Sequence, residues 1–388
     1  MQKVAEQIYI HTDVFAAQTS KKAGQPCGDQ WDVYRDKQAT TVILSDGLSS
    51  GIKAHIAATM CVARIKAMLA AGSSLREAFE ALTRTMDKAW GTSEPFAVFT
   101  VARILNNGQS TVLSYEMPPP IFINRVNVQL LNEHVYTRNK AIITESVCSI
   151  SKDEGLLLMS DGITQAGIGR FFPMGWESEG VKRFLQAKLP LKKLDGEMLS
   201  IDVHAQARAY WPAGTGDDCS VVAMVNRRGI IVNWLSGPPI DKADDEKWVK
   251  SFLNAPGIHI VSGGTTANMV SRITANPLQV IDTYSAITPP AYELPDIEMV
   301  TEGVVTLNQV FNLLDEDPAD YPENSPVSDL AWQLKMADRI NLWQGMAENK
   351  GESFIAFKQQ GLMSRSKVLS AISDRLRQMG KLVVYQNC

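Results

Sequence analysis

The stretch Thr40-Thr-Val-Ile-Leu-Ser-Asp-Gly47 is a β-branched, apolar run that ends at an aspartate followed by a glycine. A short apolar run with this flank is typical of a buried β-strand that ends in a tight turn. The same arrangement recurs at Gly155-Leu-Leu-Leu-Met-Ser-Asp-Gly162, and in reverse order at Asp217-Asp-Cys-Ser-Val-Val222. Because a strand end is rigid and glycine permits a sharp turn, we expect each aspartate to project from a fixed backbone position.

More strands and two helices are predicted around these runs. Asn106-Asn-Gly108 is a strong hairpin signal between two apolar segments, and helical spacing predicts a helix pair with Ser74 as an N-cap. The predicted strands are 97–104, 109–115 and 121–124, and the predicted helices are 52–71 and 75–90. Antiparallel strands combined with a helical pair indicate an α+β sandwich rather than a βαβ repeat.

A domain boundary is predicted at Arg227-Arg-Gly229, which divides the chain into a first domain, 1–226, and a smaller second domain, 227–388. The second domain is expected to be α/β or mainly helical. Its predicted strands are 230–234 and 258–261, and its predicted helices are 244–253, a helix opening at Ser262-Gly-Gly-Thr-Thr266, 328–345 and 364–379.

Composition excludes several classes of protein. The chain has 388 residues, enough for two domains, and its 38 basic and 42 acidic side chains give a net charge of −4. This balance argues against a general nucleic-acid binder, which usually carries a basic excess. Five scattered cysteines favour neither a disulfide framework nor a zinc site. With no membrane span and no signal-peptide core in the sequence, we expect a cytoplasmic protein.

Four aspartates lie where an apolar strand meets a turn: Asp29, Asp46, Asp161 and Asp217. Carboxylates delivered from separate strands can converge, and oxygen ligands suit hard cations such as Mg²⁺ or Mn²⁺. Two such ions ~3.5–4 Å apart can activate a water and stabilise charge on a transferring phosphoryl group. A single Asp-Gly after a strand is more often only a turn. Four clustered carboxylates without cations would repel one another, so the cluster makes sense only with metals.

The order of these motifs resembles the SpoIIE-type phosphatases, a branch of the PPM superfamily of metal-dependent serine/threonine phosphatases. The resemblance rests on Gly28-Asp29, Ile43-Leu-Ser-Asp-Gly-Leu-Ser-Ser-Gly51, Leu157-Leu-Met-Ser-Asp-Gly162 and Gly216-Asp-Asp-Cys-Ser-Val-Val222, and it covers about residues 20 to 226. It implies a sandwich of two antiparallel sheets flanked by helices, with a centre of two Mn²⁺ or Mg²⁺ ions at one edge.

The resemblance also implies roles for individual residues. Asp46 would bridge the two ions and the Gly47 carbonyl would complete one coordination shell, Asp29 would bind one ion, and Asp161 and Asp217, rather than Asp218, would hold the other. The activated water would hydrolyse phosphoserine or phosphothreonine on a bacterial regulatory protein, such as an anti-anti-sigma-like partner. No nucleic acid or membrane partner is implied, and a homodimer is left open.

Two features depart from the family pattern. Eukaryotic relatives have a histidine after the central Asp-Gly, where this chain has Leu48. They also have an arginine upstream of the first aspartate. The nearest substitutes are His55 for the histidine, and Lys21 and Lys22 for the arginine, although a structural role fits His55 and a solvated surface position fits the lysines.

A second candidate site lies outside the resemblance, in the second domain. It consists of four consecutive residues before a predicted helix: Gly263, Gly264, Thr265 and Thr266. This segment has the chemistry of an anion or ligand cradle at a helix N-terminus, or of a glycine turn capped by threonine. The alternatives to a phosphatase are therefore a non-catalytic phosphoprotein-binding scaffold and a ligand sensor that uses the C-terminal domain.

Overall fold

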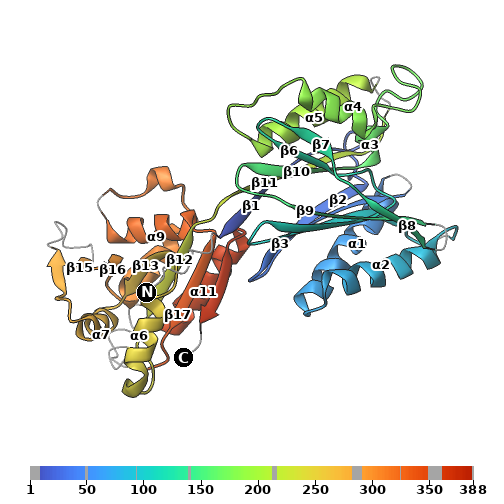
Figure 1. Cartoon of the computed structure of the whole chain (residues 1–388). Helices are drawn as coiled ribbons and strands as arrows, with labels where there is room; N and C mark the ends of the chain where they lie inside the picture. The colour runs from blue at the N-terminus through green and yellow to red at the C-terminus, as the bar shows by residue number, and fades with distance from the viewer. Residues whose placement is uncertain are drawn as a thin grey trace. The chain divides into compact units, whose positions relative to one another are not determined.

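The computed structural model describes residues 9–48, 51–92, 94–138, 141–211, 216–281, 291–323, 325–347 and 361–386. They form two compact units, which are described separately below. The first unit is Ile10–Arg228, and the second is Gly229–Cys388, to which Tyr9 also belongs. Figure 1 labels most of the helices and strands of both.

The first unit is built on two antiparallel sheets. The six-stranded sheet has the order β2-β3-β4-β5-β9-β8, and the five-stranded sheet has the order β1-β11-β10-β6-β7. The strands of the first sheet are β2 Asp29–Arg35, β3 Ala39–Gly47, β4 Ala97–Leu105, β5 Gln109–Tyr115, β8 His134–Arg138 and β9 Ala141–Ser149. Those of the second are β1 Ile10–Thr19, β6 Ile121–Asn124, β7 Val128–Leu130, β10 Glu154–Met159 and β11 Cys219–Arg228.

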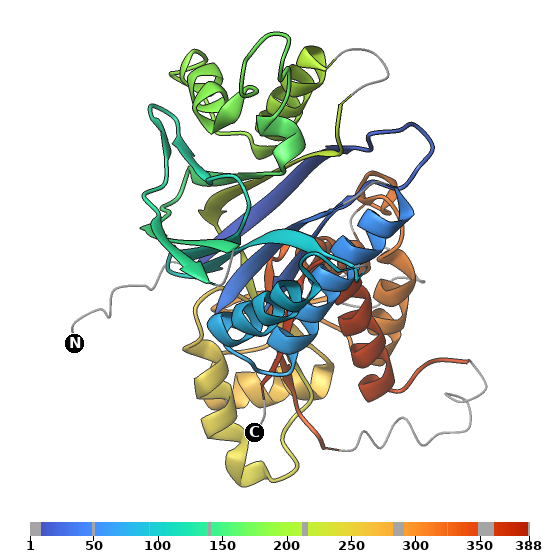
Figure 2. The same ribbon diagram turned by 90° about the vertical axis from the view of Figure 1, so that its right-hand side faces the viewer.

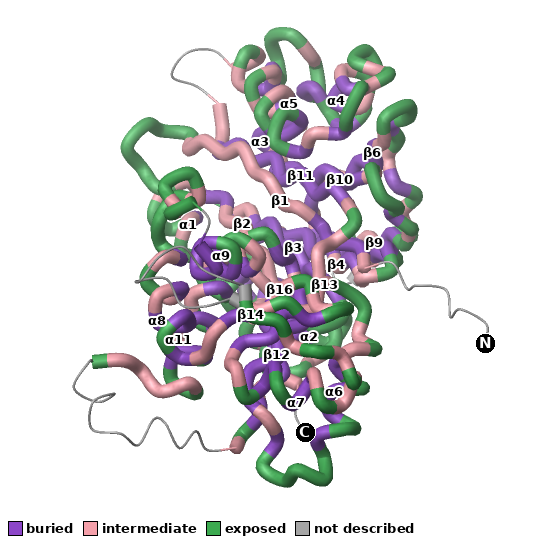
Figure 3. The backbone as a smooth tube through the Cα atoms, turned by 90° about the vertical axis from the view of Figure 1, so that its left-hand side faces the viewer, coloured by how far each residue is buried: buried purple, intermediate pink, exposed green. Residues whose placement is uncertain are grey.

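Helices cover the outer faces of this sandwich (Figures 1 and 2). α1 (Ile52–Ala70) and α2 (Leu75–Ala89) pack on the six-stranded sheet through a cluster that includes Ile65, Phe79 and Phe99. α3 (Asp161–Thr164), α4 (Glu177–Gln186) and α5 (Gly196–Tyr210) pack on the other sheet. A third cluster fills the space between the sheets, and the strands that line it are buried in Figure 3. The predicted α+β sandwich flanked by helices is confirmed.

The N-cap of α2 is also confirmed. Ser74 accepts a hydrogen bond from the Glu77 backbone, and the Glu77 carboxylate accepts one from the Ser74 backbone. This reciprocal pair satisfies two backbone donors that a helix start otherwise leaves without partners. It fixes the turn between the two helices that cover the six-stranded sheet.

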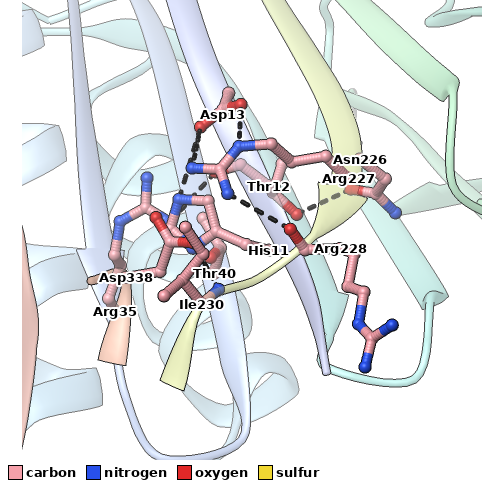
Figure 4. Close-up of polar contacts among 10 residues, drawn as sticks. All are labelled: His11, Thr12, Asp13, Arg35, Thr40, Asn226, Arg227, Arg228, Ile230 and Asp338. Carbon is pink, nitrogen blue, oxygen red and sulfur yellow. Dashed lines mark hydrogen bonds and ion pairs between the residues drawn. The ribbon is translucent and has the colours of Figure 1, made fainter. Parts of the chain in front are cut away.

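One end of the β1–β11 pair carries a cluster of paired charges (Figure 4). The Asp13 carboxylate accepts hydrogen bonds from Arg227 at 2.6 and 3.1 Å and lies 3.4 Å from the His11 ring. Burial by itself would raise the pKa of Asp13, but hydrogen bonds from His11 and Arg227 outweigh it and lower that pKa to about 2. This acid is therefore neutralised by cations from the chain itself.

The second unit contains a seven-stranded sheet with the order β14-β15-β16-β13-β12-β17-β18. Five strands are parallel, and β14 and β15 extend the sheet in antiparallel fashion. The strands are β12 Ile231–Ser236, β13 Ile258–Ser262, β14 Gln279–Ile281, β15 Ala291–Leu294, β16 Ile297–Thr301, β17 Arg339–Gln344 and β18 Leu382–Gln386. In chain order the parallel strands are arranged third, second, first, fourth, fifth, which is a doubly wound topology.

Helices lie on both faces of this sheet (Figure 2). α6 (Asp245–Leu253) and α7 (Gly264–Thr274) pack on the face that contains Leu235. α8 (Val304–Leu313), α9 (Pro326–Met336) and α11 (Arg365–Gln378) pack on the face that contains Trp234. Of the two predicted alternatives for this region, α/β is the one found. Within the described residues, no helix is both long and apolar enough to cross a membrane.

The helix predicted over 328–345 is wrong in its second half. α9 ends at Met336, and Arg339–Gln344 forms β17 in the middle of the sheet. Four consecutive residues of β17 are buried, because helices cover both faces of a parallel sheet. Such an unbroken apolar run cannot be distinguished from a buried helix by its periodicity.

Candidate metal centre

The four predicted aspartates lie at corresponding ends of strands in the two sheets of the first unit. Asp29 opens β2 and is the direct cross-strand partner of Asp46, near the end of β3. Asp161 follows β10 as the first residue of α3, and Asp217 lies just before β11. Since β10 and β11 are antiparallel neighbours, the end of one and the start of the other are adjacent.

The charges of these side chains act on one another, so the two pairs meet across the sandwich. Burial raises the pKa of Asp46 well above its ordinary value, and the negative charges of Asp29, Asp161 and Asp217 raise it further. Burial also raises the pKa of Asp161, although a hydrogen bond with Asp46 partly offsets this effect. The structure thus brings together four acids that are far apart in the sequence.

Asp29 is the most deeply placed of the four. Its side chain is fully buried, and its Oδ2 accepts a hydrogen bond of 2.7 Å from the Ser220 hydroxyl. Burial raises the pKa of Asp29, the hydroxyls of Ser220 and Ser160 oppose the rise, and the charges of nearby acids add to it. Its Oδ1 is buried and has no hydrogen-bond partner in the part of the chain that the structure describes. A buried carboxylate oxygen without a donor is in a state that a bound cation would relieve.

Asp161 and Asp217 are each oriented by a neighbour. The Gln165 side-chain amide donates a hydrogen bond of 2.8 Å to Asp161 Oδ2. Asp217 Oδ1 accepts a hydrogen bond of 3.0 Å from the Asp218 backbone and lies 3.4 Å from the Lys21 ammonium group. Because Lys21 and Asp217 are both more than one-third exposed, solvent weakens this ion pair.

Asp218 is a fifth acid of this cluster, although the family resemblance favours Asp217 as the ligand. Its side chain is 6% exposed, and its Oδ1 accepts a hydrogen bond of 2.8 Å from the Lys21 backbone. Its charge raises the pKa of Asp29, whereas the charge of Asp217 acts on Asp46 and Asp161. Asp217 and Asp218 therefore act on different acids of the cluster. In the sequence, the only sign that Asp218 belongs to the cluster is its position next to Asp217.

Three glycines allow the acid-bearing segments to approach closely. A Cβ atom at Gly47 would lie 2.0 Å from the Ala54 carbonyl oxygen, and one at Gly162 would lie 2.0 Å from the Asp218 carbonyl oxygen. A Cβ at Gly28 would lie 2.6 Å from a carboxylate oxygen of Asp218. These glycines are therefore needed for backbone packing, in addition to the turns that the sequence predicts at Gly47 and Gly162.

The donor set fits a divalent cation in chemistry. All the candidate metal ligands are oxygen atoms, as hard divalent cations prefer. The Asp29 Oδ1 atom accepts no hydrogen bond from the described residues. Among the described residues, no cation lies as close to these acids as Arg227 lies to Asp13. As the side chains stand, however, no group of three or more His, Cys, Asp or Glu among the described residues is arranged to hold a metal ion. The acids share an electrostatic environment without forming a complete coordination shell.

His55, the predicted substitute for the missing histidine, lies in the surroundings of a structural side chain. The His55 ring contacts the Cys27 carbonyl at 2.9 Å and the Gln30 side chain at 3.1 Å, contacts typical of a structural histidine. Leu48 is 55% exposed and supplies no titratable group beside Asp46.

The predicted cradle belongs to the second unit and is separate from the acid cluster. Gly263 is the N-cap of α7, and Gly264, Thr265 and Thr266 form its first turn. The alternative of a threonine cap is wrong, because the N-cap is a glycine and no side chain caps this helix. Thr265 is exposed, whereas Thr266 is buried and its hydroxyl accepts a hydrogen bond from the Gly237 backbone. The two threonines therefore do not act as a pair: Thr266 joins two turns of the chain, and only Thr265 faces solvent.

Comparison with known proteins identifies the first unit. Residues 36–225 match the family model described as Stage II sporulation protein E (SpoIIE). The resemblance to SpoIIE-type phosphatases thus holds for this unit, and the matched residues make up just under half of the chain. A comparison with curated proteins finds no match.

Several solved structures are similar to this chain at low identity. The PP2C phosphatase domain of SpoIIE from Bacillus subtilis, with a fragment of its regulatory domain, has a TM-score of 0.48 at 17% identity, covering 57% of this chain and 65% of that chain. The match thus spans less than two thirds of that chain. The RsbU and RsbW domains of a Mycobacterium tuberculosis protein give 0.45 at 14%, covering 63% and 69%. The phosphatase Stp1 from Staphylococcus aureus gives 0.42 at 11%, covering 58% and 99%.

Proposed function

We propose that the first unit is a metal-dependent phosphoprotein phosphatase that hydrolyses phosphoserine or phosphothreonine. The observation that carries the proposal is the meeting of Asp29, Asp46, Asp161 and Asp217 from four separate segments, with one buried carboxylate oxygen left without a partner among the described residues. Gathering acids in this way destabilises the metal-free fold, because like charges in a buried site repel. Because this repulsion lowers the stability of the metal-free protein, we expect the negative charge of the cluster to have a function, namely the binding of cations.

Asp29, Asp46, Asp161, Asp217 and the Gly47 carbonyl would hold two Mn²⁺ or Mg²⁺ ions. When bound, such ions supply positive charge that activates a water and stabilises a transferring phosphoryl group. The chain's own contribution is to orient these ligands. Ser220 holds one oxygen of Asp29 and so leaves the other oxygen available, and Gln165 fixes the orientation of Asp161. Because Leu48 carries no titratable proton, the leaving oxygen must be protonated from elsewhere.

The proposed substrate is a phosphorylated bacterial regulatory protein, such as an anti-anti-sigma-like partner. This step rests on the similarity of residues 36–225 to the SpoIIE family model. Serine or threonine specificity can be tested directly by comparing phosphoserine, phosphothreonine and phosphotyrosine peptides of one sequence. We expect turnover of the first two and little of the third.

The decisive test is Asp46→Asn, assayed with an aryl phosphate in the presence of Mn²⁺. We expect at least about a 100-fold loss of metal-dependent turnover, because the amide removes the charge at the centre of the cluster. The matched control is Asp32→Asn, which lies on β2 with Asp29 but pairs with Lys66. The control should retain activity. Full turnover by Asp46→Asn, with the fold intact by circular dichroism, would remove Asp46 from the mechanism.

A non-catalytic phosphoprotein-binding scaffold is the second candidate. It is favoured by the lack of any three described acidic, histidine or cysteine side chains arranged to hold a metal as they stand. A scaffold would bind a phosphopeptide without hydrolysing it at any Mn²⁺ concentration. Turnover of an aryl phosphate that depends on Mn²⁺ would exclude this alternative.

A further inference from the structure

The carboxyl ends of the parallel strands are the part of the second unit where its topology would place a ligand. In a doubly wound sheet, ligands bind where the strand order reverses, because the connections on either side lead to opposite faces. Here the reversal lies between β12 and β17, since β12 leads to α6 on one face and β17 leads to α11 on the other. Fold alone does not establish a site, so the residues at this edge must carry the argument.

The turns at this edge are built from glycine and lie against one another. A Cβ at Gly345, after β17, would lie 2.2 Å from the carbonyl oxygen of Gly237, after β12. On the neighbouring strands, a Cβ at Gly263 would lie 4.0 Å from the Cα of Gly303. These glycines let the segments that follow neighbouring strands pack closely, which brings the helix starts of this edge near one another.

Three helices begin at this edge without a side-chain cap. α7 and α8 have glycines, Gly263 and Gly303, at the N-cap, and the N-cap of α11 is Ser364, whose hydroxyl makes no capping bond. Each helix start therefore retains backbone N–H donors and the positive end of the helix dipole. The contrast within the same chain is α2, whose N-terminus is closed by a capping box.

Two buried hydroxyls at this edge lack partners, and they are the independent sign of a ligand. Ser236 is the last residue of β12, and its Oγ has no hydrogen-bond partner among the described residues. Strand alternation places it on the face of Trp234, where α8 and α11 pack. Thr306, in the first turn of α8, is also fully buried with its hydroxyl unpartnered in the described part of the chain. Hydroxyls in this state are costly unless something else satisfies them.

Charged groups divide the edge into two parts. The Arg365 guanidinium, at the start of α11, donates to the carbonyls of Gly345 and Ala347 at 2.9 and 2.6 Å and lies against Gly237. The Glu302 carboxylate, before α8, accepts a hydrogen bond from the Gly303 backbone, and a Cβ at Gly264 would lie 4.0 Å from it and from the Tyr292 hydroxyl. Phosphate suits the Arg365 part, whereas Glu302 repels phosphate and accepts hydrogen bonds from ligand hydroxyls.

We propose that this carboxyl edge binds a small molecule that carries a phosphate group and neighbouring hydroxyls, as nucleotides and sugar phosphates do. The phosphate lies toward Arg365 and the start of α11, within reach of the Ser236 hydroxyl. The ligand hydroxyls lie toward Glu302. The proposal concerns the second unit alone and does not depend on phosphatase activity in the first.

The test is calorimetric titration of the full chain with AMP, ribose 5-phosphate and inorganic phosphate. We expect AMP, ribose 5-phosphate or both to bind, and inorganic phosphate to bind at least about 10-fold more weakly, because it offers nothing to Glu302. Binding of AMP alone would indicate a nucleotide, and equal binding of both would indicate that the sugar phosphate part is recognised. If neither of the two binds at millimolar concentration, the proposal is wrong.

Two pairs of variants locate the site. Ser236→Ala should weaken binding about 10-fold, whereas Ser373→Ala, which removes another buried hydroxyl without a described partner on α11, should leave it unchanged. Glu302→Gln should weaken AMP or ribose 5-phosphate but not inorganic phosphate, whereas Glu298→Gln, near the other end of β16, should do neither. Binding that Ser236→Ala and Glu302→Gln both leave unchanged would place the ligand elsewhere and overturn the proposal.

Discussion

β1 and β11 pair along their whole length, and acidic groups lie near both ends of this pair in opposite surroundings. At one end, His11 and Arg227 hold the pKa of Asp13 below its ordinary value despite its partial burial. At the other end, burial and neighbouring acids raise the pKa of Asp29, and only hydroxyl groups oppose the rise. The charge of Asp13 is paired within the chain, whereas among the described residues only the exposed Lys21 ammonium group pairs with an acid of the other cluster. We propose that cations from solution complete the second cluster.

The contrast shows what distinguishes a structural cluster of charges from the proposed functional one within the same β-sandwich. A structural cluster supplies its own counter-charge, so its energy favours folding. A functional cluster leaves the counter-charge out, so its energy favours binding of a cation. The two kinds of cluster can be told apart only when the hydrogen-bond and ion-pair partners of each aspartate are known, because the aspartates themselves are chemically identical.

The largest expected effect comes from Gly47→Ala, which would push the acidic segments apart. The added Cβ would meet the Ala54 carbonyl oxygen at 2.0 Å, and the backbone of α1 cannot move without disturbing its packing. We expect about 3 kcal/mol of lost stability in urea unfolding, together with loss of Mn²⁺-dependent activity. Gly72→Ala is the control: an added Cβ there meets nothing within 4 Å, so only the strain of its positive φ, about 1 kcal/mol, applies. Equal losses would show that the close approach does not matter.

Asp29→Asn should raise the stability of the metal-free protein at neutral pH by about 2 kcal/mol, because it removes a buried charge that lacks a counter-ion. The Asn amide oxygen can still accept the hydrogen bond from Ser220. The gain should grow as the pH rises from about 4 to about 7 and then level off, because burial raises the pKa of Asp29 from 3.8 to about 7 on folding and the ionised form is the costly one. Chemical unfolding with a chelator present measures it. A destabilising effect would contradict the view that this end of the sandwich is electrostatically incomplete.

Asp13→Asn should destabilise the protein by about 1 kcal/mol at pH 6, after allowance for partial exposure. The pKa of Asp13 falls from 3.8 to about 2 on folding, so its contribution is complete above the unfolded value and is lost as the pH falls from about 4 to 2. The difference from the unmodified chain should therefore vanish near pH 2. Asp153→Asn, an exposed carboxylate of the same unit, provides the baseline. A difference that persists at pH 2 would mean that packing rather than charge is responsible.

Lys21→Met should have the smallest effect, below about 0.5 kcal/mol in urea unfolding. Its ammonium group lies 3.4 Å from Asp217, but both side chains are more than one-third exposed. Arg227→Met, at the other end, removes two hydrogen bonds to Asp13 and should cost about 1–2 kcal/mol. If Lys21→Met lowered the stability as much as Arg227→Met, the acids at both ends of the β1–β11 pair would be stabilised equally by the chain's own cations, contrary to the contrast drawn above.

Much of the first unit was predictable because local signals agreed with the fold. The hairpin at Asn106-Asn-Gly108, the Ser74 cap and the apolar runs before Asp46 and Asp161 each specify structure within a few residues. Strand ends also predicted where the acids project. Whether the acids bind metal stays a prediction, because the sequence and the side chains as they stand do not form a coordination shell.

The remaining features depend on contacts between distant segments. Ser220 and Ser160 orient Asp29 from other strands, and no local pattern distinguishes them from ordinary strand serines. In the second unit, the unbroken apolar sequence of β17 was predicted as part of a helix. The order of the strands in the sheet depends on which face each connecting helix covers. Neither property is encoded at short range.

The most direct test of the central claim is a crystal soaked in Mn²⁺ and measured at the manganese absorption edge. We expect two anomalous peaks among the carboxylates of Asp29, Asp46, Asp161 and Asp217, and none beside Asp13, where Arg227 already supplies the counter-charge. Absence of manganese from the first cluster at saturating concentration, in protein that hydrolyses an aryl phosphate, would contradict it.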